Sequence, residues 1–174
     1  DVHGSRGLGD VYKRQIECLS KVLDTKANDT LAKIDLVKED INYLNKISQI
    51  NKVSGIKVML ILNMQGTSPI VAGLGTSGDG FINMTGASNA ANQFEGWKPI
   101  SSEAIISYNP DYIIITNRGM SSFPDVQSLA NTTSLRLTSA AQNGRILQED
   151  GMAMLGFGTR TISTAIQFAK VFSE

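Results

Sequence analysis

The order of apolar and polar residues predicts one long amphipathic helix near the start of the chain. Apolar residues recur at three- and four-residue spacing between Leu31 and Ile47, which indicates a single apolar face. Asn28, Asp29 and Thr30 precede this pattern and offer side-chain oxygens for its N-cap, and Ser54-Gly55 ends it. A helix of about 20 residues is about 30 Å long, so it either covers a sheet or separates two lobes.

Two apolar runs further along predict strands of a largely parallel sheet. The first is Ile56–Leu62 and the second is Asp111–Thr116, and Gly, Pro or Asn residues bound both. A third strand is expected at Arg145–Gln148, and the last helix at Thr161–Phe172. The sequence therefore predicts an α/β fold, in which helices cover a mostly parallel sheet that follows the long helix.

Weaker signals fill the remaining stretches. Ile70–Ala72 is a short apolar run, and Trp97 falls outside any helix or strand period, so a loop is expected there. Short helices are expected at Ser77–Thr85, at Ser102–Tyr108 behind the N-cap Ser101, after Phe123-Pro124-Asp125, and within the polar stretch 131–142.

The glycines that follow the short apolar run Ile70–Ala72 match a nucleotide-binding pattern. Gly73–Gly78 reads G-x-G-x-x-G, which in dinucleotide-binding folds follows a long strand and lets the backbone approach a pyrophosphate. Here the preceding run is short, and 87–96 holds no strand signal that would carry the acidic partner residue. A nucleotide-binding α/β enzyme using Gly73–Gly78 is therefore the alternative from another class, beside a plain strand–turn–helix.

Composition narrows the functional classes further. The 16 basic and 16 acidic residues balance, which gives no indication of nucleic-acid binding, and no apolar run is long enough to span a membrane. Cys18 is the single cysteine, so an internal disulfide cannot form. The single histidine, His3, lies in 1–15, whose end resembles a translated sequencing adapter and is expected to be non-native and disordered. Without it, no Cys/His metal site and no usual general base are expected, so binding is favoured over catalysis.

Ligands of parallel sheets bind outside the carboxyl ends of the strands, which here are 63–67 and 117–120. We expect the binding residues at these two strand ends, at Trp97, and in the glycine-rich segment before the last helix. They are Met64, Trp97, Arg118, Met120, Met152, Phe157 and Arg160. Arginine at a helix start is disfavoured by the helix dipole, so Arg160 is either simply exposed or faces an anion. Such a surface suits a large, flat, partly apolar molecule that carries carboxylates.

Several segments, taken in order, resemble the haem-binding proteins of bacterial ABC importers, whose wider family includes vitamin B12 and ferric-siderophore binding proteins. They are Lys57–Leu62 (KVMLIL), Ser68–Thr76 (SPIVAGLGT), Phe94–Pro99 (FEGWKP), Asn109–Ile114 (NPDYII) and Leu155–Gly158 (LGFG). The resemblance covers about residues 30–174. It implies that 16–52 contains the helix connecting two lobes, and that 53–174 is the C-terminal, Rossmann-like ligand-binding lobe of a two-lobed protein.

The resemblance also implies a function. Haem, or a related iron or cobalt tetrapyrrole, would be captured as a transported ligand in the cleft between the lobes and delivered to a membrane permease, with no catalytic cofactor. Such a protein would be a periplasmic or surface-anchored monomer. Vitamin B12 and ferric siderophores are the alternative ligands.

The resemblance assigns roles to single residues as well. Glu103 occupies the position of a glutamate that docks to permease arginines, although the dipole of its own helix also favours a carboxylate there. Trp97 matches a ligand-facing tryptophan, and Arg160 matches an arginine near the ligand. The tyrosine that coordinates iron is expected in an N-terminal lobe, so no metal ligand is predicted in this sequence.

Overall fold

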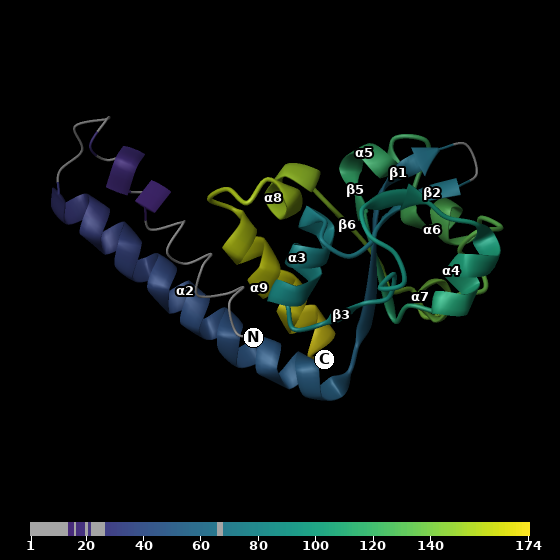
Figure 1. Ribbon diagram of the computed structural model, residues 1–174, viewed down its shortest axis with the longest axis horizontal. Coiled ribbons are helices and arrows are strands. Elements are labelled where there is room, and N and C mark those ends of the chain that lie inside the picture. Colours follow the sequence, from purple (N-terminus) through teal and green to yellow (C-terminus); the bar gives the residue numbers. More distant parts are fainter. Residues whose placement is uncertain (1–13, 16, 20, 22–26, 66–67) are drawn as a thin grey trace.

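The structure is a computed structural model that describes residues 14–15, 17–19, 21, 27–65 and 68–174. The prediction for the first thirteen residues, including His3, lies outside the described residues, while Arg14 and Gln15 are helical. Helix α2 (Ala27–Ser54) is 28 residues long, about 42 Å, and its first half extends away from the body of the molecule (Figure 1). The helix begins before Asn28, so the predicted capping group lies within its first turn.

The described part of the chain forms a six-stranded sheet in the order β4-β2-β1-β5-β6, with β3 paired to β1. The strands are β1 (Lys57–Gln65), β2 (Ser68–Ala72), β3 (Ser88–Asn89), β4 (Trp97–Pro99), β5 (Tyr112–Thr116) and β6 (Ile146–Glu149). The pairs β1·β3, β1·β5 and β5·β6 are parallel, whereas β2 is antiparallel to both β1 and β4. The predicted α/β fold with a mostly parallel sheet is thus confirmed, with an antiparallel margin.

Helices cover both faces of this sheet (Figure 1). One face carries α2, α3 (Ser77–Met84), α8 (Gly151–Leu155) and α9 (Thr161–Phe172), and the other carries α4 (Ser102–Tyr108), α5 (Asn117–Met120), α6 (Val126–Ala130) and α7 (Ser139–Gln142). Leu60 and Ile114 face the first side, and Met59 and Ile113 face the second, all with no exposed surface. Alternation along buried strands therefore divides the apolar runs between two cores.

Two local expectations are wrong. Trp97 was expected in a loop, but it begins β4, because Ala72 of β2 offers it a pairing partner that the sequence period does not reveal. The two-residue strand β3 lies in 87–96, where no strand was expected. In addition, helix α8 occupies part of the glycine-rich stretch before α9, for which neither a helix nor a strand was predicted from the sequence. All three elements are too short to produce a recognisable hydrophobic period.

The second half of α2 is fixed to the body by buried polar and close backbone contacts. The Asn51 side-chain amide donates to the carbonyl oxygens of Thr85 and Ala169, at 2.8 and 2.9 Å. Gly86 has a φ of +83°, and a Cβ there would lie 2.1 Å from the Ser48 carbonyl oxygen, so only glycine fits beside the helix. None of the helices in the described ranges is long and apolar enough to cross a membrane.

Candidate functional site

Thr116 organises the edge of the sheet where the parallel strands end. Its hydroxyl donates to the Leu62 carbonyl oxygen at 2.5 Å and accepts from the Gly119 amide at 3.0 Å. A Cβ at Gly151 would lie 3.3 Å from the Thr116 methyl group, so the start of α8 packs against the same residue. The ends of β1 and β5 and the first residue of α8, which follows β6, therefore meet at one edge, which we call the rim. This is the edge where ligands of such sheets bind.

Arg118 and Met120 lie on α5 at the rim, but their side chains differ in accessibility. Arg118 is exposed, whereas Met120 is only 6% exposed and packs into the second core. Met64, near the end of β1, is partly buried and packs against the same core. Of these three predicted binding residues, Arg118 is thus the one that the structure leaves accessible, and Met120 acts as a core residue.

Trp97 and Phe157 both lie against α3, where glycines make room for them. A Cβ on Gly78 would lie 3.0 Å from Trp97 Cη2, and one on Gly80 would lie 3.3 Å from Phe157 Cζ. Phe157 has a φ of +46°, a conformation that is uncommon for a residue with a side chain. The two aromatic residues, 60 positions apart in the sequence, therefore approach one short helix from β4 and from the loop after α8.

The structure does not place Trp97 beside Arg118. Trp97 pairs with Ala72 on the edge strand β4, and β2 and β1 lie between β4 and β5, which leads into Arg118. With neighbouring strands about 4.8 Å apart, the lateral separation of β4 and β5 is about 14 Å. Arg118 and Met64 thus share the rim, whereas Trp97 and Phe157 each lie against α3.

Arg160, at the start of α9, forms an ion pair that the sequence did not reveal. Its Nη2 lies 2.8 Å from Asp150 Oδ2, and the other carboxylate oxygen accepts from the Met152 amide at 2.9 Å, capping α8. The Met152 amide first, and Arg160 second, lower the pKa of the Asp150 carboxyl below its ordinary value of 3.8. The Arg160 side chain keeps 62% of its surface accessible to solvent, so a ligand could contact it.

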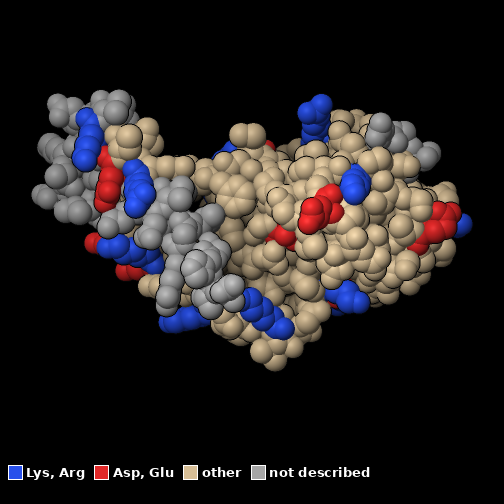
Figure 2. All heavy atoms as spheres, viewed as in Figure 1, with Lys and Arg blue, Asp and Glu red and all other residues tan. Residues whose placement is uncertain are grey.

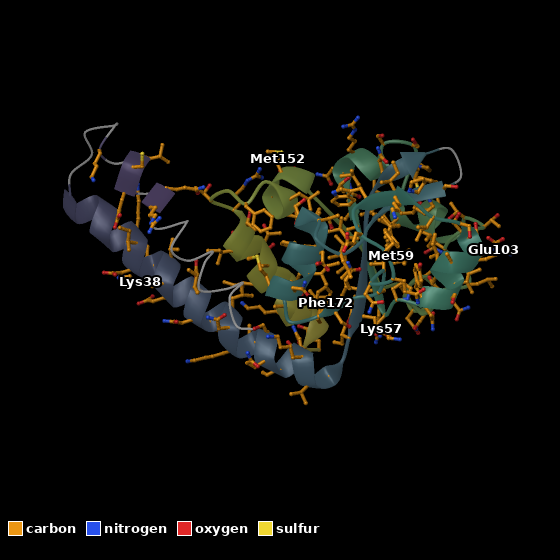
Figure 3. All side chains as sticks on the ribbon, in the orientation of Figure 1. Lys38, Lys57, Met59, Glu103, Met152 and Phe172 are labelled. Atoms are coloured by element: carbon orange, nitrogen blue, oxygen red, sulfur yellow. The ribbon has the colours of Figure 1, made fainter. Side chains whose placement is uncertain are left out.

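Glu103 lies in the first turn of α4 and is exposed, away from Met152 of α8 in the view of Figure 3. Its own backbone N–H and the Ser101 hydroxyl lower the pKa of the carboxyl. Ser101 also caps the helix, by accepting from the Ala104 amide at 3.3 Å. The Glu103 carboxylate is exposed, so another protein could contact it. A negative charge in the first turn of α4 also interacts favourably with the helix dipole.

Three amides of the glycine-rich loop before α3 already donate hydrogen bonds within the protein. The Gly73 and Leu74 amides donate to the carbonyl oxygens of Gly96 and Phe94. The Gly75 amide donates to Asp79 Oδ2 at 3.2 Å, so a carboxylate fills the place that a phosphate would need. Asp79 is held in turn by the Asn89 side-chain amide at 3.0 Å. The strand before this loop, β2, is antiparallel to its neighbours, unlike the parallel strand that precedes a dinucleotide-binding turn. This geometry therefore does not favour the nucleotide-binding alternative.

Sequence reasoning missed Asp150 as a site residue and named Met152 only among the expected cleft residues. Met152 is 70% exposed on α8, which Figure 3 shows at the margin of the body. An Asp directly after a strand and before a short apolar run is a helix-capping signal, and it could have indicated α8. Figure 2 shows acidic and basic side chains scattered over this face of the molecule. Within the described ranges, no three His, Cys, Asp or Glu residues could hold a metal ion together.

These features define a class of protein: an α/β lobe with helices on both faces of a mostly parallel sheet, and with exposed cationic side chains near the edge where the parallel strands end. Residues 5–150 match the family described as periplasmic binding protein, and the chain belongs to this family. The family consists of binding proteins, so the prediction of a binding role in place of catalysis is confirmed.

Solved structures of the family share the fold. The chain is similar to the periplasmic heme-binding protein BhuT in complex with two hemes (23% identity, TM-score 0.69), with 95% of this chain and 62% of that chain covered. It is similar to the periplasmic heme-binding protein HutB of Vibrio cholerae (24% identity, TM-score 0.74; 91% and 61% covered). It is also similar to the catecholate-siderophore binding protein VctP of Vibrio cholerae (19% identity, TM-score 0.70; 97% and 61% covered).

The chain spans about three fifths of the length of these structures. None of the curated protein sequences compared with the chain matches it.

Proposed function

We propose that this chain belongs to the substrate-binding component of an ABC importer, and that it contributes one wall of a cleft that captures haem. The observation that carries the proposal is Arg160, an exposed cation at the start of α9, three residues after an aromatic side chain. Within the described part of the chain, the guanidinium has one ion-pair partner, the carboxylate of Asp150. Guanidinium groups pair well with carboxylates, and a haem carries two of them on a flat apolar ring.

Two further features support haem. Exposed Met152 and half-buried Phe157, on α8 and in the loop after it, offer polarisable and aromatic surface. Arg118 supplies a second exposed cation at the rim. BhuT and HutB, which share the fold, are described as heme-binding proteins. The remaining wall of the cleft, with an iron-coordinating tyrosine, would come from a second lobe, as the family resemblance implies.

A ferric siderophore is the second candidate ligand, because VctP shares the fold to the same degree. Vitamin B12 is the third. Both are large ligands that aromatic side chains and arginine could hold.

A titration of this chain with hemin, a ferric catecholate siderophore, cobalamin and NAD in parallel tests the proposal. Hemin is expected to bind weakly, with a shift of the Soret band, and the completed two-lobed protein is expected to bind it tightly. Binding of the siderophore or cobalamin with no hemin response would move the assignment within the family. NAD binding without any hemin response would overturn it.

Delivery to a permease is part of the same proposal. Glu103, exposed in the first turn of α4, would dock to arginines of the permease, and the protein would act as a monomer in the periplasm or anchored at the cell surface. Family membership supports the compartment, and the exposure of the Glu103 carboxylate supports the docking role.

A further inference from the structure

We propose that Asp150 is the exchange partner of Arg160: it holds the guanidinium while the cleft is empty and takes it back when the ligand carboxylate leaves. The inference rests on the proposed function, since it requires that Arg160 meets a carboxylate ligand. Asp150 would thus position the Arg160 guanidinium, and would affect how tightly the ligand is captured and how fast it is released.

The geometry gives Asp150 two separate tasks. Oδ1 accepts from the Met152 amide at 2.9 Å and so caps α8, while Oδ2 meets Arg160 Nη2 at 2.8 Å. The cap contact holds the carboxylate in place whether or not Arg160 is bound to it. Asp150 is therefore a fixed anion, and Arg160 is the partner able to move.

Arg160 has little else to hold it. It precedes α9 as the N-cap residue, but its side chain makes no capping hydrogen bond. A guanidinium has five N–H donors, and within the described residues its side chain has one ion-pair partner, Asp150, so donors remain for a ligand. The helix dipole disfavours a cation at this end of α9, which raises the need for a nearby anion.

Exposure makes the exchange feasible. The Arg160 side chain is 62% exposed and that of Asp150 is 37% exposed, and such ion pairs are weak because water screens the charges. A ligand carboxylate can therefore compete for Arg160. When the ligand leaves, the guanidinium returns to an anion that has stayed in position, so release does not leave an unpaired cation at the rim.

Asp150→Asn tests this role, because Asn is also a favourable N-cap residue and keeps the capping oxygen while the charge is removed. Asp125→Asn is the matched control: Asp125 caps α6 through a 2.7 Å contact from the Ser128 amide, and it has no ion pair with any residue that the structure describes. Both variants change the net charge equally. Hemin and hemin dimethyl ester, whose carboxylates are blocked, serve as probes under the same detergent conditions.

The expected result is that Asp150→Asn binds hemin about two- to five-fold more tightly and releases it more slowly, as removal of a weak surface competitor predicts. The dimethyl ester should bind both proteins equally, and Asp125→Asn should behave as the unmodified chain. The gain should also vanish in an Arg160→Gln background, which a merely structural effect of Asp150 would not do.

Unchanged or weaker hemin binding by Asp150→Asn, or an equal gain with the ester, would overturn the exchange role while leaving the haem proposal intact. No hemin binding by the unmodified chain, even weak, would overturn both.

Discussion

Asn51 of α2 donates its side-chain amide to the carbonyl oxygen of Ala169 in α9 at 2.9 Å, although 118 positions separate the two residues in the sequence. The same amide donates to the Thr85 carbonyl oxygen at 2.8 Å, just after α3. Asn51 has no exposed surface. One buried side chain therefore ties the long helix to two elements of the first core, and this fixes the direction in which α2 leaves the body.

Replacement of Asn51 should destabilise the protein strongly. Asn51→Ala leaves two buried carbonyl oxygens without their donor, which we expect to lower the free energy of unfolding by about 2–4 kcal/mol. Asn51→Asp should cost more, because it places a carboxylate oxygen against both carbonyl oxygens in a buried position. Urea denaturation would measure both changes. Asn92→Asp, at an exposed position, is the control, and equal stability of the two aspartate variants would contradict the assignment.

Trp97 is the single tryptophan of the chain, so its fluorescence reports on the contact between its ring and α3. A Cβ on Gly78 would lie 2.6 Å from the Ala72 Cβ and 3.0 Å from Trp97 Cη2, and the Ala72 atom cannot move aside without the backbone. Gly78→Ala should therefore displace the indole, shift its fluorescence emission, and lower the free energy of unfolding by about 1–3 kcal/mol.

Gly158→Ala is the matched control for that substitution. A Cβ there would meet nothing within 4 Å, and Gly158 does not have a positive φ. It should leave the Trp97 emission unchanged and should be neutral or stabilising by up to about 1 kcal/mol, through the entropy of the unfolded chain. An emission shift in Gly158→Ala as large as in Gly78→Ala would show that the glycine–indole contact is not the cause.

Helices and strands were predicted well where hydrophobic residues repeat at a regular spacing. They were predicted poorly where pairing between distant strands determines the structure. The spacing from Leu31 to Ile47 identified α2, and the run Ile113–Ile115 identified β5, because burial imposes a regular pattern on both. The antiparallel pairing of β2 depends on a turn and on the register with β1, which a five-residue run does not encode.

The candidate site shows the same division. The resemblance singled out Trp97 and Arg160, but neither local pattern nor resemblance could indicate that Trp97 pairs with Ala72, or that Asp150 meets Arg160 across α8. Met120 followed a strand end as expected, yet it turned inward because α5 is a single turn packed on the second core. Position at a strand end therefore predicts the neighbourhood of a residue, and not the direction of its side chain.

Acid should remove part of the stability. Backbone and side-chain donation from Ser128 lowers the pKa of Asp125 in the folded protein below its ordinary value of 3.8. A carboxyl with a depressed folded pKa stabilises the fold fully above its unfolded pKa, and this contribution is lost as pH falls through the folded pKa. Asp125→Asn should thus be less stable than the unmodified chain near neutral pH, and the difference should disappear as the pH falls through the lowered folded pKa of Asp125.

Urea denaturation at a series of pH values would measure this difference. Asp150 and Glu103 also have lowered pKa values, so the unmodified chain keeps some acid dependence in either case. A difference between Asp125→Asn and the unmodified chain that stays constant with pH would mean that the Asp125 charge contributes nothing, and that the substitution acts through packing alone.

Glu103 provides the test of delivery, because its two interpretations predict different phenotypes. If it acts only on the dipole of α4, Glu103→Arg should weaken that short helix slightly, since Ser101 still accepts from the Ala104 amide, and transport should continue. If it docks to permease arginines, the same change places like charges together and should nearly abolish ligand uptake by cells that express the complete importer, with Glu103→Ala intermediate.

Glu95→Arg, equally charged and exposed, is the control and should transport normally. Hemin affinity should be unchanged in all three variants, because Glu103 lies on α4 and none of the proposed ligand-binding residues lies on that helix. Loss of hemin affinity in Glu103→Arg would refute the docking role, since it would place the carboxylate in the ligand cleft.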